Sequence, residues 1–356
     1  MLEIRKARRD ELEEVIKLSD YVFRESRGHQ PSMGQQFPFM FSGDNLDSVY
    51  VAQIDGKIVS IIGTVLNDAI IYGHKVRMAS MGSVCTHPDF WGRGIGTKLL
   101  EYTFDDLYAK KAGIVTISGT RGLYKRNKAV NQGNVYGFEI ETAAIPETDK
   151  GRISYEYITE SSIAGRLHRV YVNEPVRYSR TEKDFPVLFD ARPMVAPNES
   201  NRFSALAARV GNVDLAYIIG YRQESAYKIV EYAGERSIIP ALLKEIERFG
   251  YTSVSIDVPD YDETLISIMN YHDIKPKYEG EMPTTVRITN RAELLKQLTP
   301  VLMEVYGYSA EGVEELASML QEDDGECAKA LFDRNFKRDI FDAAIPLPWP
   351  NGLNYI

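Results

Sequence analysis

The sequence contains few cysteines, few histidines and no long uncharged apolar segment. Its 356 residues include 2 Cys and 5 His. Cys85 and Cys327 form no CxxC pair, and no carboxylate–histidine cluster occurs, so neither a disulfide framework nor a metal site is expected. The best apolar run, residues 58–66, has the length of a strand, whereas a membrane-spanning helix needs about 20 residues. The amino terminus lacks the apolar core of a secretion signal. We therefore expect a soluble, cytoplasmic protein without a metal.

The charge balance is acidic. The chain has 42 Lys and Arg against 51 Asp and Glu, a formal net charge of −9. This balance argues against nucleic acid or an anionic membrane as the main partner and favours a neutral or cationic substrate. With 44% hydrophobic and 26% charged residues the composition is that of an ordinary globular protein. The length favours two domains, with room for a small third part.

The first 145 residues follow the pattern of a mixed α/β sheet. Asp10, with Glu13 three residues later, predicts the start of the first helix, and Asp55-Gly56 predicts a hairpin turn. The predicted strands are 2–6, 49–54, 57–65, 70–76, 78–86 and 114–118, with 135–140 as the closing strand of this sheet. A second helix is predicted at 94–108.

The pattern changes near residue 148, and three parts are predicted: 1–148, 149–286 and 287–356. The second part repeats the first in outline, with strands at 215–221, 227–232 and 253–258 and helices at 238–248 and 263–271. Only residues 233–236 (AGER) stand where the first part has a glycine-rich turn, so no phosphate site is expected there. The third part has amphipathic helices at 294–305 and 313–321, an acidic run at 321–326 expected to be a solvated helix end, and an extended proline-containing end.

A glycine-rich turn is the most informative feature. Residues 92, 94 and 96 are glycines placed between a strand that Pro88 ends and a predicted helix. Without a Cβ, the unpaired N–H groups of the first helical turn can approach phosphate oxygens, and Arg93 and Lys98 can add positive charge. A tight turn also needs glycine for conformational reasons alone, so both explanations stand. The spacing fits neither a Walker A loop nor a dinucleotide-binding fingerprint.

The stretch 84–100, V-x-T-H-P-x-x-x-G-R-G-I-G-T-x-L-L, resembles the acyl-CoA-binding motif of the GNAT superfamily of N-acyltransferases. That motif reads Gln or Arg, two residues, Gly, one residue, then Gly or Ala; here Trp91 takes the first place, with Gly94 and Gly96 in the others. The resemblance implies an α/β (α+β) fold, a mixed, mainly antiparallel sheet flanked by helices, and then a degenerate GNAT-like domain with a small helical lobe. It implies acetyl-CoA as co-substrate. Its pyrophosphate would lie on the N–H groups of Arg93, Gly94, Ile95, Gly96 and Thr97.

The same resemblance assigns roles around the thioester. The strand 82–85 would splay at a bulge, and Val84, Cys85 and Thr86 would pair with the pantetheine arm. The Val84 N–H would face the thioester oxygen. Tyr124, just after the strand 114–118, would protonate the departing thiolate. Two alternatives remain, an alignment that uses Tyr136 and a purely structural Tyr124.

Neither Cys85 nor His87 is expected to act in catalysis. Cys85 has no Cys/His pattern around it and is expected to be a small buried residue rather than a nucleophile. His87, in a Thr-His-Pro loop start, is expected to face solvent or be hydrogen bonded.

The sequence leaves the general base open. Candidates are Glu25, which is also a candidate substrate contact, Asp44, Asp47 and the carboxylate of Ile356. The last follows from a resemblance to the Eis-like acetyltransferases, in which the C-terminus enters the active site. The alternative is a tail that is loose or packs at an edge.

These observations predict an N-acetyltransferase that transfers an acetyl group from acetyl-CoA to a primary amine by direct attack. The net charge favours a polyamine, an aminoglycoside or a basic peptide as acceptor. The alternatives are a non-catalytic acyl-CoA sensor with the same fold and a phosphate-binding regulator. No nucleic-acid or membrane partner is expected, and a homo-oligomer is compatible with the sequence.

Overall fold

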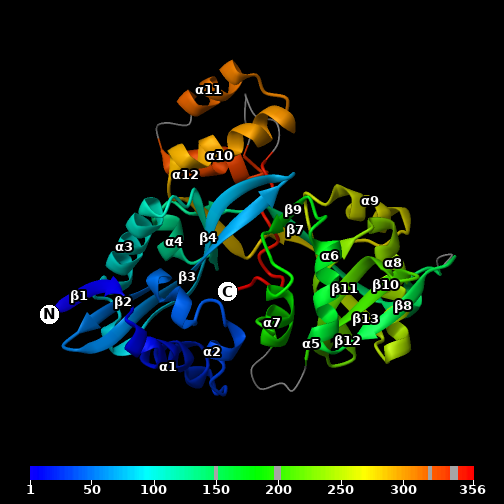
Figure 1. The fold of residues 1–356 in the computed structure, drawn as a ribbon, viewed down its shortest axis with the longest axis horizontal. Coiled ribbons are helices and arrows are strands. Elements are labelled where there is room, and N and C mark those ends of the chain that lie inside the picture. The colour runs from blue at the N-terminus through cyan, green and yellow to red at the C-terminus, as the bar shows by residue number, and fades with distance from the viewer. Residues whose placement is uncertain (148–150, 196–201, 320–322, 337–343) are drawn as a thin grey trace.

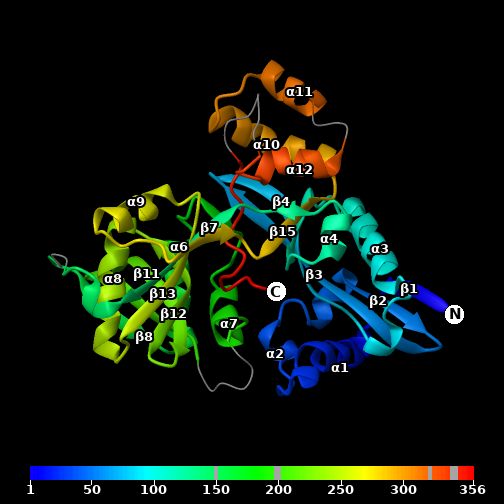
Figure 2. The same cartoon turned by 180° about the vertical axis from the view of Figure 1, so that it is seen from behind.

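The computed structural model describes residues 1–147, 151–195, 202–319, 323–336 and 344–356. Two sheets with their helices lie side by side, and a helical lobe covers one end of the first sheet (Figures 1 and 2). The last residues of the chain run between the two halves in both views. The predicted mixed α/β fold with mainly antiparallel sheets is confirmed.

The first sheet has the strand order β1-β2-β3-β4-β5-β15-β6, with β9 paired to β3. The β4–β5 pair is parallel and the others are antiparallel. Positive φ angles at Asp55-Gly56 and Tyr72-Gly73 make the two hairpin turns possible. The strands are β1 (Leu2–Lys6), β2 (Val49–Ile54), β3 (Lys57–Ile71), β4 (His74–Thr86), β5 (Ile114–Ser118), β6 (Val130–Asn131), β9 (Val176–Tyr178) and β15 (Thr284–Ile288).

Helices cover both faces of this sheet. Because successive side chains of a strand point to opposite faces, Ile61 packs with the side of α1 (Leu12–Phe23) and Ile62 with the side of α3 (Ile95–Ala109). The short helix α2 (Met33–Gln36) lies on the α1 side, and α4 (Gly122–Arg126) lies on the α3 side. The two faces therefore present different surroundings to the middle of β4.

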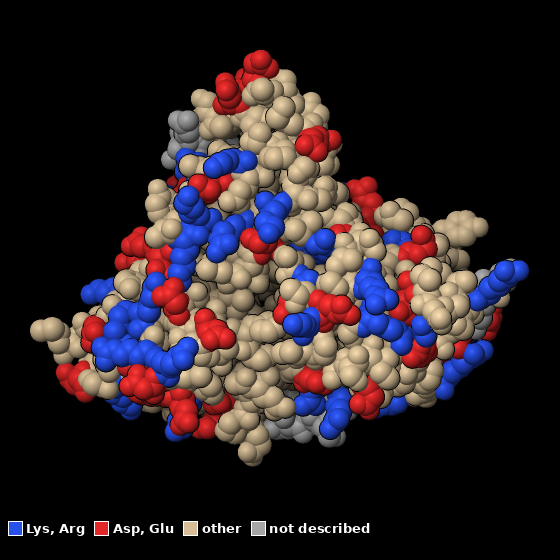
Figure 3. Space-filling view, in the orientation of Figure 1, with Lys and Arg blue, Asp and Glu red and all other residues tan. Residues whose placement is uncertain are grey.

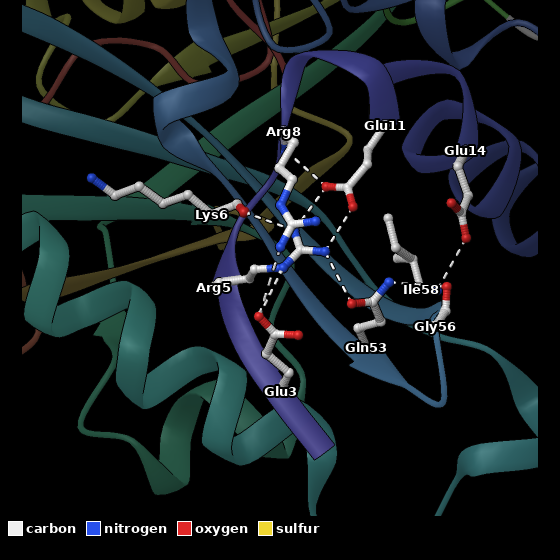
Figure 4. Close-up of polar contacts among 9 residues, drawn as sticks. All are labelled: Glu3, Arg5, Lys6, Arg8, Glu11, Glu14, Gln53, Gly56 and Ile58. Atoms are coloured by element: carbon white, nitrogen blue, oxygen red, sulfur yellow. Dashed lines mark hydrogen bonds and ion pairs between the residues drawn. The ribbon is translucent and has the colours of Figure 1, made fainter. Parts of the chain in front are cut away.

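The start of α1 differs from the prediction. Residues 9–11 form a 3₁₀ turn, and Glu11, not Asp10 with Glu13, closes the helix start by accepting from the Arg8 N–H at 2.8 Å. The Arg5 guanidinium holds the Glu11 carboxylate at 2.6 and 2.7 Å, and Figure 4 shows that carboxylate between Arg5 and Arg8. The ion pair with Arg5 on β1, six residues earlier in the chain, holds Glu11 in the capping role.

The second sheet has the order β14-β7-β13-β12-β11-β10-β8, and among the described residues its one parallel pair is β12–β13. Its strands are β7 (Asn134–Glu141), β8 (Ser154–Ile158), β10 (Ser204–Val210), β11 (Val213–Gln223), β12 (Ala226–Gly234), β13 (Ser253–Pro259) and β14 (Tyr278–Glu281). Its helices are α5 (Ser161–Ala164), α6 (His168–Tyr171), α7 (Asp184–Ala191), α8 (Ile239–Glu245) and α9 (Glu263–Tyr271). Each sheet thus contains one parallel pair next to an antiparallel ladder, in line with the predicted repeat.

The two sheets exchange strands. The segment predicted to close the first sheet, 135–140, is β7 and pairs with β13 and β14 of the second sheet. β15 pairs with β5 in its place. The prediction for 135–140 is wrong because a strand's pattern reveals that it is buried but not which partner it pairs with. The division of the chain at 148 and 286 stays a prediction about folding units.

The C-terminal lobe packs on the far end of the first sheet. It consists of α10 (Arg291–Glu304), α11 (Ala310–Met319) and α12 (Asp324–Phe332). The first two overlap the predicted helices 294–305 and 313–321, and each begins three residues before its prediction; residues 320 and 321 lie outside the described residues. The third was not predicted. Asp323, in the acidic run expected to be a solvated helix end, starts α12 by accepting from the Gly325 N–H at 2.7 Å. Residues 321 and 322 of that run lie outside the described residues.

The last residues form neither a loose nor an edge-packed tail. Ile345 and Leu347 are buried in the cluster of the C-terminal lobe, Leu353 in a cluster of the second half, and Ile356 contacts the cluster of α1. Trp349 donates to the carbonyl of Val230 on β12 at 3.0 Å. The tail therefore connects three hydrophobic clusters and ends against the first sheet.

Candidate active site

Strand β4 is irregular where the sequence predicted a bulge. Within the β3–β4 ladder, Ser83 and Val84 together face the single residue Ile62. Ser83 has a φ of 49°, which non-glycine residues seldom adopt, and its hydroxyl lies 2.5 Å from that of Ser19 on α1. The predicted bulge is confirmed, and it turns the main chain at Val84 out of the ladder.

β4 and β5 separate at the same level. Their parallel pairing runs from Met78 with Ile114 to Met81 with Ile117, and the described residues show no β4–β5 pair beyond it. Residues 82–86 of β4 therefore turn one backbone edge toward a space instead of a strand. Such an edge can pair with an extended ligand.

The amino end of α3 faces open space. Gly94 is the N-cap residue with a φ of 71°, and no side chain caps the helix. Within the helix the first backbone bond to Gly94 comes from the Lys98 N–H at 3.2 Å, so the N–H groups of Ile95, Gly96 and Thr97 have no acceptor in the helix. A Cβ at position 94 would meet no atom within 4 Å. These features suit a diphosphate, which needs close approach to several N–H groups.

The residues around this turn hold its shape. Trp91, which departs from the motif, is 65% exposed and donates from its indole to the Thr86 carbonyl at 2.7 Å. Thr86 also bonds Ser60 through its hydroxyl at 2.8 Å. The exposed Arg93 bends back to the Asp89 carbonyl at 3.2 Å. Trp91 therefore ties the strand end to the turn and leaves the backbone of 94–97 uncovered.

Tyr124 lies beside the space between β4 and β5. It sits on α4, is 3% exposed, and its ring is 3.6 Å from where a Cβ on Gly119 would stand. Burial is the main cause that raises the pKa of Tyr124, while the nearby Arg121 lowers it. The described residues offer its hydroxyl no hydrogen-bond partner. The alternative tyrosine, Tyr136, lies on β7 beside a different cavity.

The end of the chain reaches the bulge. A Cβ at Gly82 would lie 2.6 Å from the main-chain carboxyl carbon of Ile356 and 2.8 Å from its oxygen. Only glycine at position 82 lets the tail approach β4 this closely. Tyr355 packs on Phe37 with ring centroids 6.2 Å apart.

These features meet in one cavity of about 440 Å³. Its walls come from α1 and the turn after it, the β4 bulge, the β5–α4 connection, a segment of the second half, and the tail. The lining residues are Phe23, Arg24, Arg27, Met33, Phe37, Ser83, Val84, Ser118, Gly119, Arg121, Tyr124, Pro193, Met194, Val195, Tyr355 and Ile356.

Of the four candidate bases, only Ile356 lines this cavity. Glu25 is exposed in the turn after α1, between lining residues but not among them. Asp44 is exposed and lies 3.9 Å from Arg9, and Asp47 forms ion pairs with Lys6 and Lys110.

Cys85 and His87 have the structural surroundings expected of them. Cys85 is buried, and desolvation raises the pKa of its thiol to about 12. A thiol with so high a pKa is not a nucleophile at neutral pH. The His87 ring stacks on Tyr21 at 5.0 Å and accepts from the Asp89 N–H at 3.3 Å.

Three arginines line the cavity, and none of them was among the predicted site residues. Arg24 and Arg27 follow α1, and Arg121 precedes α4. No acidic side chain is among the described lining residues. In the sequence these arginines look like ordinary surface residues, and only the fold brings them together.

The surface near the cavity departs from the net charge of the whole chain. Figure 3 shows a hollow near the middle of this face, close to where Figure 1 marks the C-terminus. Lys and Arg side chains gather on the side of α3 and α4. Exposed basic residues there are Arg93, Lys98, Lys125 and Arg126. This local positive field suits phosphate groups although the chain is acidic overall.

A larger cavity of about 640 Å³ lies between the β3–β4 hairpin and the second half. Its charged groups are largely paired with each other: Arg236 bonds Glu174 at 2.5 Å and Asp262 at 2.8 Å. Arg236 belongs to the segment that stands in place of the glycine turn in the repeat, so this part of the second half is closed by its own side chains.

Comparison with known proteins identifies the first part of the chain. Residues 3–128 match the family model described as the acetyltransferase (GNAT) domain. This match contains the bulge, the glycine turn and Tyr124. Over these residues the first part of the chain is therefore similar to a GNAT acetyltransferase domain. No curated protein matches the sequence significantly.

Solved structures show that the similarity of fold extends beyond this domain. A probable N-acyltransferase from Enterococcus faecalis is 15% identical with a TM-score of 0.67, over 83% of this chain and 75% of that one. A GCN5-related N-acetyltransferase from Anabaena variabilis has 15% identity, a TM-score of 0.64 and the same coverage. Eis1 from Mycobacterium abscessus has 12% identity and a TM-score of 0.62, over 83% of this chain and 76% of that one. The fold is Eis-like over most of the chain.

Among the described residues, no helix is both long and apolar enough to cross a membrane. The same residues contain no group of three or more His, Cys, Asp or Glu side chains that could hold a metal ion.

Proposed function

We propose that the protein transfers an acetyl group from acetyl-CoA to a primary amine by direct attack. One observation carries the proposal: the β4 bulge, the buried Tyr124 and the carboxyl group of Ile356 line the same cavity. Each would supply a different group that the reaction needs. The glycine-capped end of α3 follows the same strand, after the turn that ends it.

Acetyl-CoA would enter from the α3 side. The N–H groups of residues 93–97 would hold its pyrophosphate, and the open edge of β4 at Val84, Cys85 and Thr86 would pair with the pantetheine arm. The bulge supports this role because it takes the Val84 main chain out of the β3–β4 ladder.

The chemistry needs a proton acceptor, an oxyanion donor and a proton donor. The Ile356 carboxylate would take the proton of the attacking amine, and the Val84 N–H would stabilise the oxyanion of the tetrahedral intermediate. A carbon–nitrogen bond forms, the carbon–sulfur bond breaks, and Tyr124 gives its proton to the leaving thiolate. Since burial raises the pKa of Tyr124, its phenol stays protonated at neutral pH and can donate.

Thermal unfolding with and without acetyl-CoA tests the donor site first, because it needs no acceptor. A ligand present at 100 times its dissociation constant stabilises the folded state by about 2.7 kcal/mol, which raises the midpoint by a few degrees. Release of free thiol in the presence of an amine panel then tests transfer.

The two readouts separate this function from its alternatives. A midpoint shift without thiol release for any amine would favour an acyl-CoA sensor. No shift with acetyl-CoA or longer acyl-CoAs would overturn the acyl-CoA site and leave the glycine turn as a structural feature.

A further inference from the structure

The cavity is cationic on the side opposite the proposed acetyl-CoA entry. Arg24 and Arg27 line it from the turn that follows α1, together with the apolar side chains of Phe23, Met33 and Phe37. α1 and α3 cover opposite faces of the first sheet. Arg24 and Arg27 therefore lie on the acceptor side, whereas Arg121, next to α4, lies on the donor side.

Arg24 is held in place by neutral groups only. Its guanidinium donates to Ser32 Oγ at 2.8 Å, Gln36 Oε1 at 2.7 Å and the Phe23 carbonyl at 3.1 Å. The carboxylate of Asp20 is near enough to raise the pKa of Arg24, but the two side chains form no ion pair within 4 Å. Asp20 accepts instead from the N–H groups of residues 32 and 33 at 2.7 and 2.9 Å.

Arg27 adds a second positive charge close to the first. Burial is the main cause that lowers the pKa of Arg24; the nearby Asp20 charge raises it, and the Arg27 charge lowers it further. No described side chain forms an ion pair with either charge, and an anion bound between the two guanidiniums would pair with both and remove their mutual repulsion.

We propose that the acceptor is a primary amine whose molecule also carries an apolar body and one anionic group, a carboxylate or a phosphate, that binds Arg24 and Arg27. The apolar walls would contact the body, and the amine would point toward Ile356 and Val84. This proposal rests on the proposed function. It differs from the expectation of a cationic acceptor that the net charge of −9 suggested, because the charged side chains that line the cavity are arginines and the Ile356 carboxylate is assigned to the attacking amine.

Matched pairs of amines test the proposal. Phenylalanine is compared with phenethylamine, and phosphoethanolamine with ethanolamine, so that each pair differs only by the anionic group; spermidine serves as the cationic probe. Binding is measured by thermal unfolding with CoA present, and transfer by thiol release from acetyl-CoA. We expect the anionic member of at least one pair to bind roughly tenfold more tightly than its partner. The two pairs distinguish a carboxylate from a phosphate.

Arginine variants test which residues are responsible for the preference for an anionic amine. Arg27→Gln should abolish the discrimination within the favoured pair and leave the acetyl-CoA shift unchanged, and Arg24→Gln should do the same if it folds. Arg9→Gln is the control, because Arg9 is exposed and outside the cavity. No preference for the anionic member in either pair, tighter binding of spermidine than of both anionic amines, or full discrimination in Arg27→Gln would overturn the proposal. Failure of the proposed function would show itself separately, as the absence of any shift with acetyl-CoA alone.

Discussion

Burial raises the pKa of two reactive side chains in this region, and the consequence differs between them. Desolvation raises the pKa of both the Tyr124 phenol and the Cys85 thiol. For Tyr124 this keeps the proton on a hydroxyl that lines the cavity, as a general acid requires. For Cys85 it keeps the thiol protonated and unreactive. The same physical effect therefore makes one residue suitable for catalysis and the other not.

Tyr124→Phe should lower kcat roughly hundredfold, because it removes the proton donor for the thiolate. The midpoint shift with acetyl-CoA should persist, and the free energy of unfolding should change by less than about 1 kcal/mol, since the hydroxyl has no described hydrogen-bond partner. Tyr136→Phe is the matched control and should keep its activity. A fall in activity confined to Tyr136→Phe would mean that the alternative alignment is the right one.

Cys85→Ala should retain transfer activity. The substitution removes one buried sulfur atom, which costs about 1 kcal/mol of stability, and no nucleophile is lost. Iodoacetamide should leave Cys85 unmodified in the folded protein, as mass spectrometry can show. A variant that binds acetyl-CoA normally but does not turn over would contradict the direct-attack mechanism.

At the scale of elements, local patterns predicted the structure well wherever short-range interactions decide it. The strand 114–118 and the helix 263–271 have the bounds predicted for them, and the glycine turn precedes a helix as expected. Long-range pairing was beyond the sequence, as β7 shows by joining the second sheet. The capping role of Glu11 depends instead on Arg5, only six residues away. The bulge, in contrast, could be placed from the family resemblance, because it belongs to a recurring motif.

At the amino end of α3, one substitution should stabilise the helix and at the same time prevent acetyl-CoA from binding. Gly96→Glu places a carboxylate in the first turn of α3, where the helix dipole favours it by about 0.5 kcal/mol. A Cβ there meets only Thr86 Oγ1, at 3.5 Å. The variant should be at least as stable as the parent protein, yet its unfolding midpoint should no longer respond to acetyl-CoA, since the new charge repels the pyrophosphate.

Gly96→Ala is the control and should keep the response, because it adds only a methyl group. An unchanged acetyl-CoA shift in Gly96→Glu would place the pyrophosphate away from the α3 terminus.

At the scale of the whole molecule, the tail joins the two halves at the active site. Its anchor is the buried ion pair of Arg180 and Glu231, at 2.8 Å. Arg180 also binds the Asn354 side chain at 2.6 Å, and Glu231 accepts from the Leu353 N–H at 3.2 Å. The halves therefore cooperate through residues far apart in sequence, which explains why the sequence left the position of the tail open.

Extending the chain by one glycine after Ile356 should lower kcat at least roughly tenfold, because the terminal carboxylate moves away from the amine. Acetyl-CoA binding should be unaffected by the extension. Ile356→Val keeps the carboxylate and should remain active. Equal activity of the extended protein would assign the base to another group.

Neutralising the anchor should both destabilise the protein and release the tail. Glu231→Gln leaves the Arg180 guanidinium buried without its counter-charge, a change that costs about 3–5 kcal/mol in comparable buried pairs. Urea unfolding should show this loss, and transfer should fall together with it, because Leu353 and Asn354 no longer hold Ile356 at Gly82. Glu247→Gln removes the exposed acid of a pair with the half-buried Lys244, at 2.9 Å, and should change stability by less than about 1 kcal/mol. If Glu231→Gln lost stability but kept full transfer activity, the tail would reach the cavity without this anchor, and the coupling of the two halves to catalysis would be wrong.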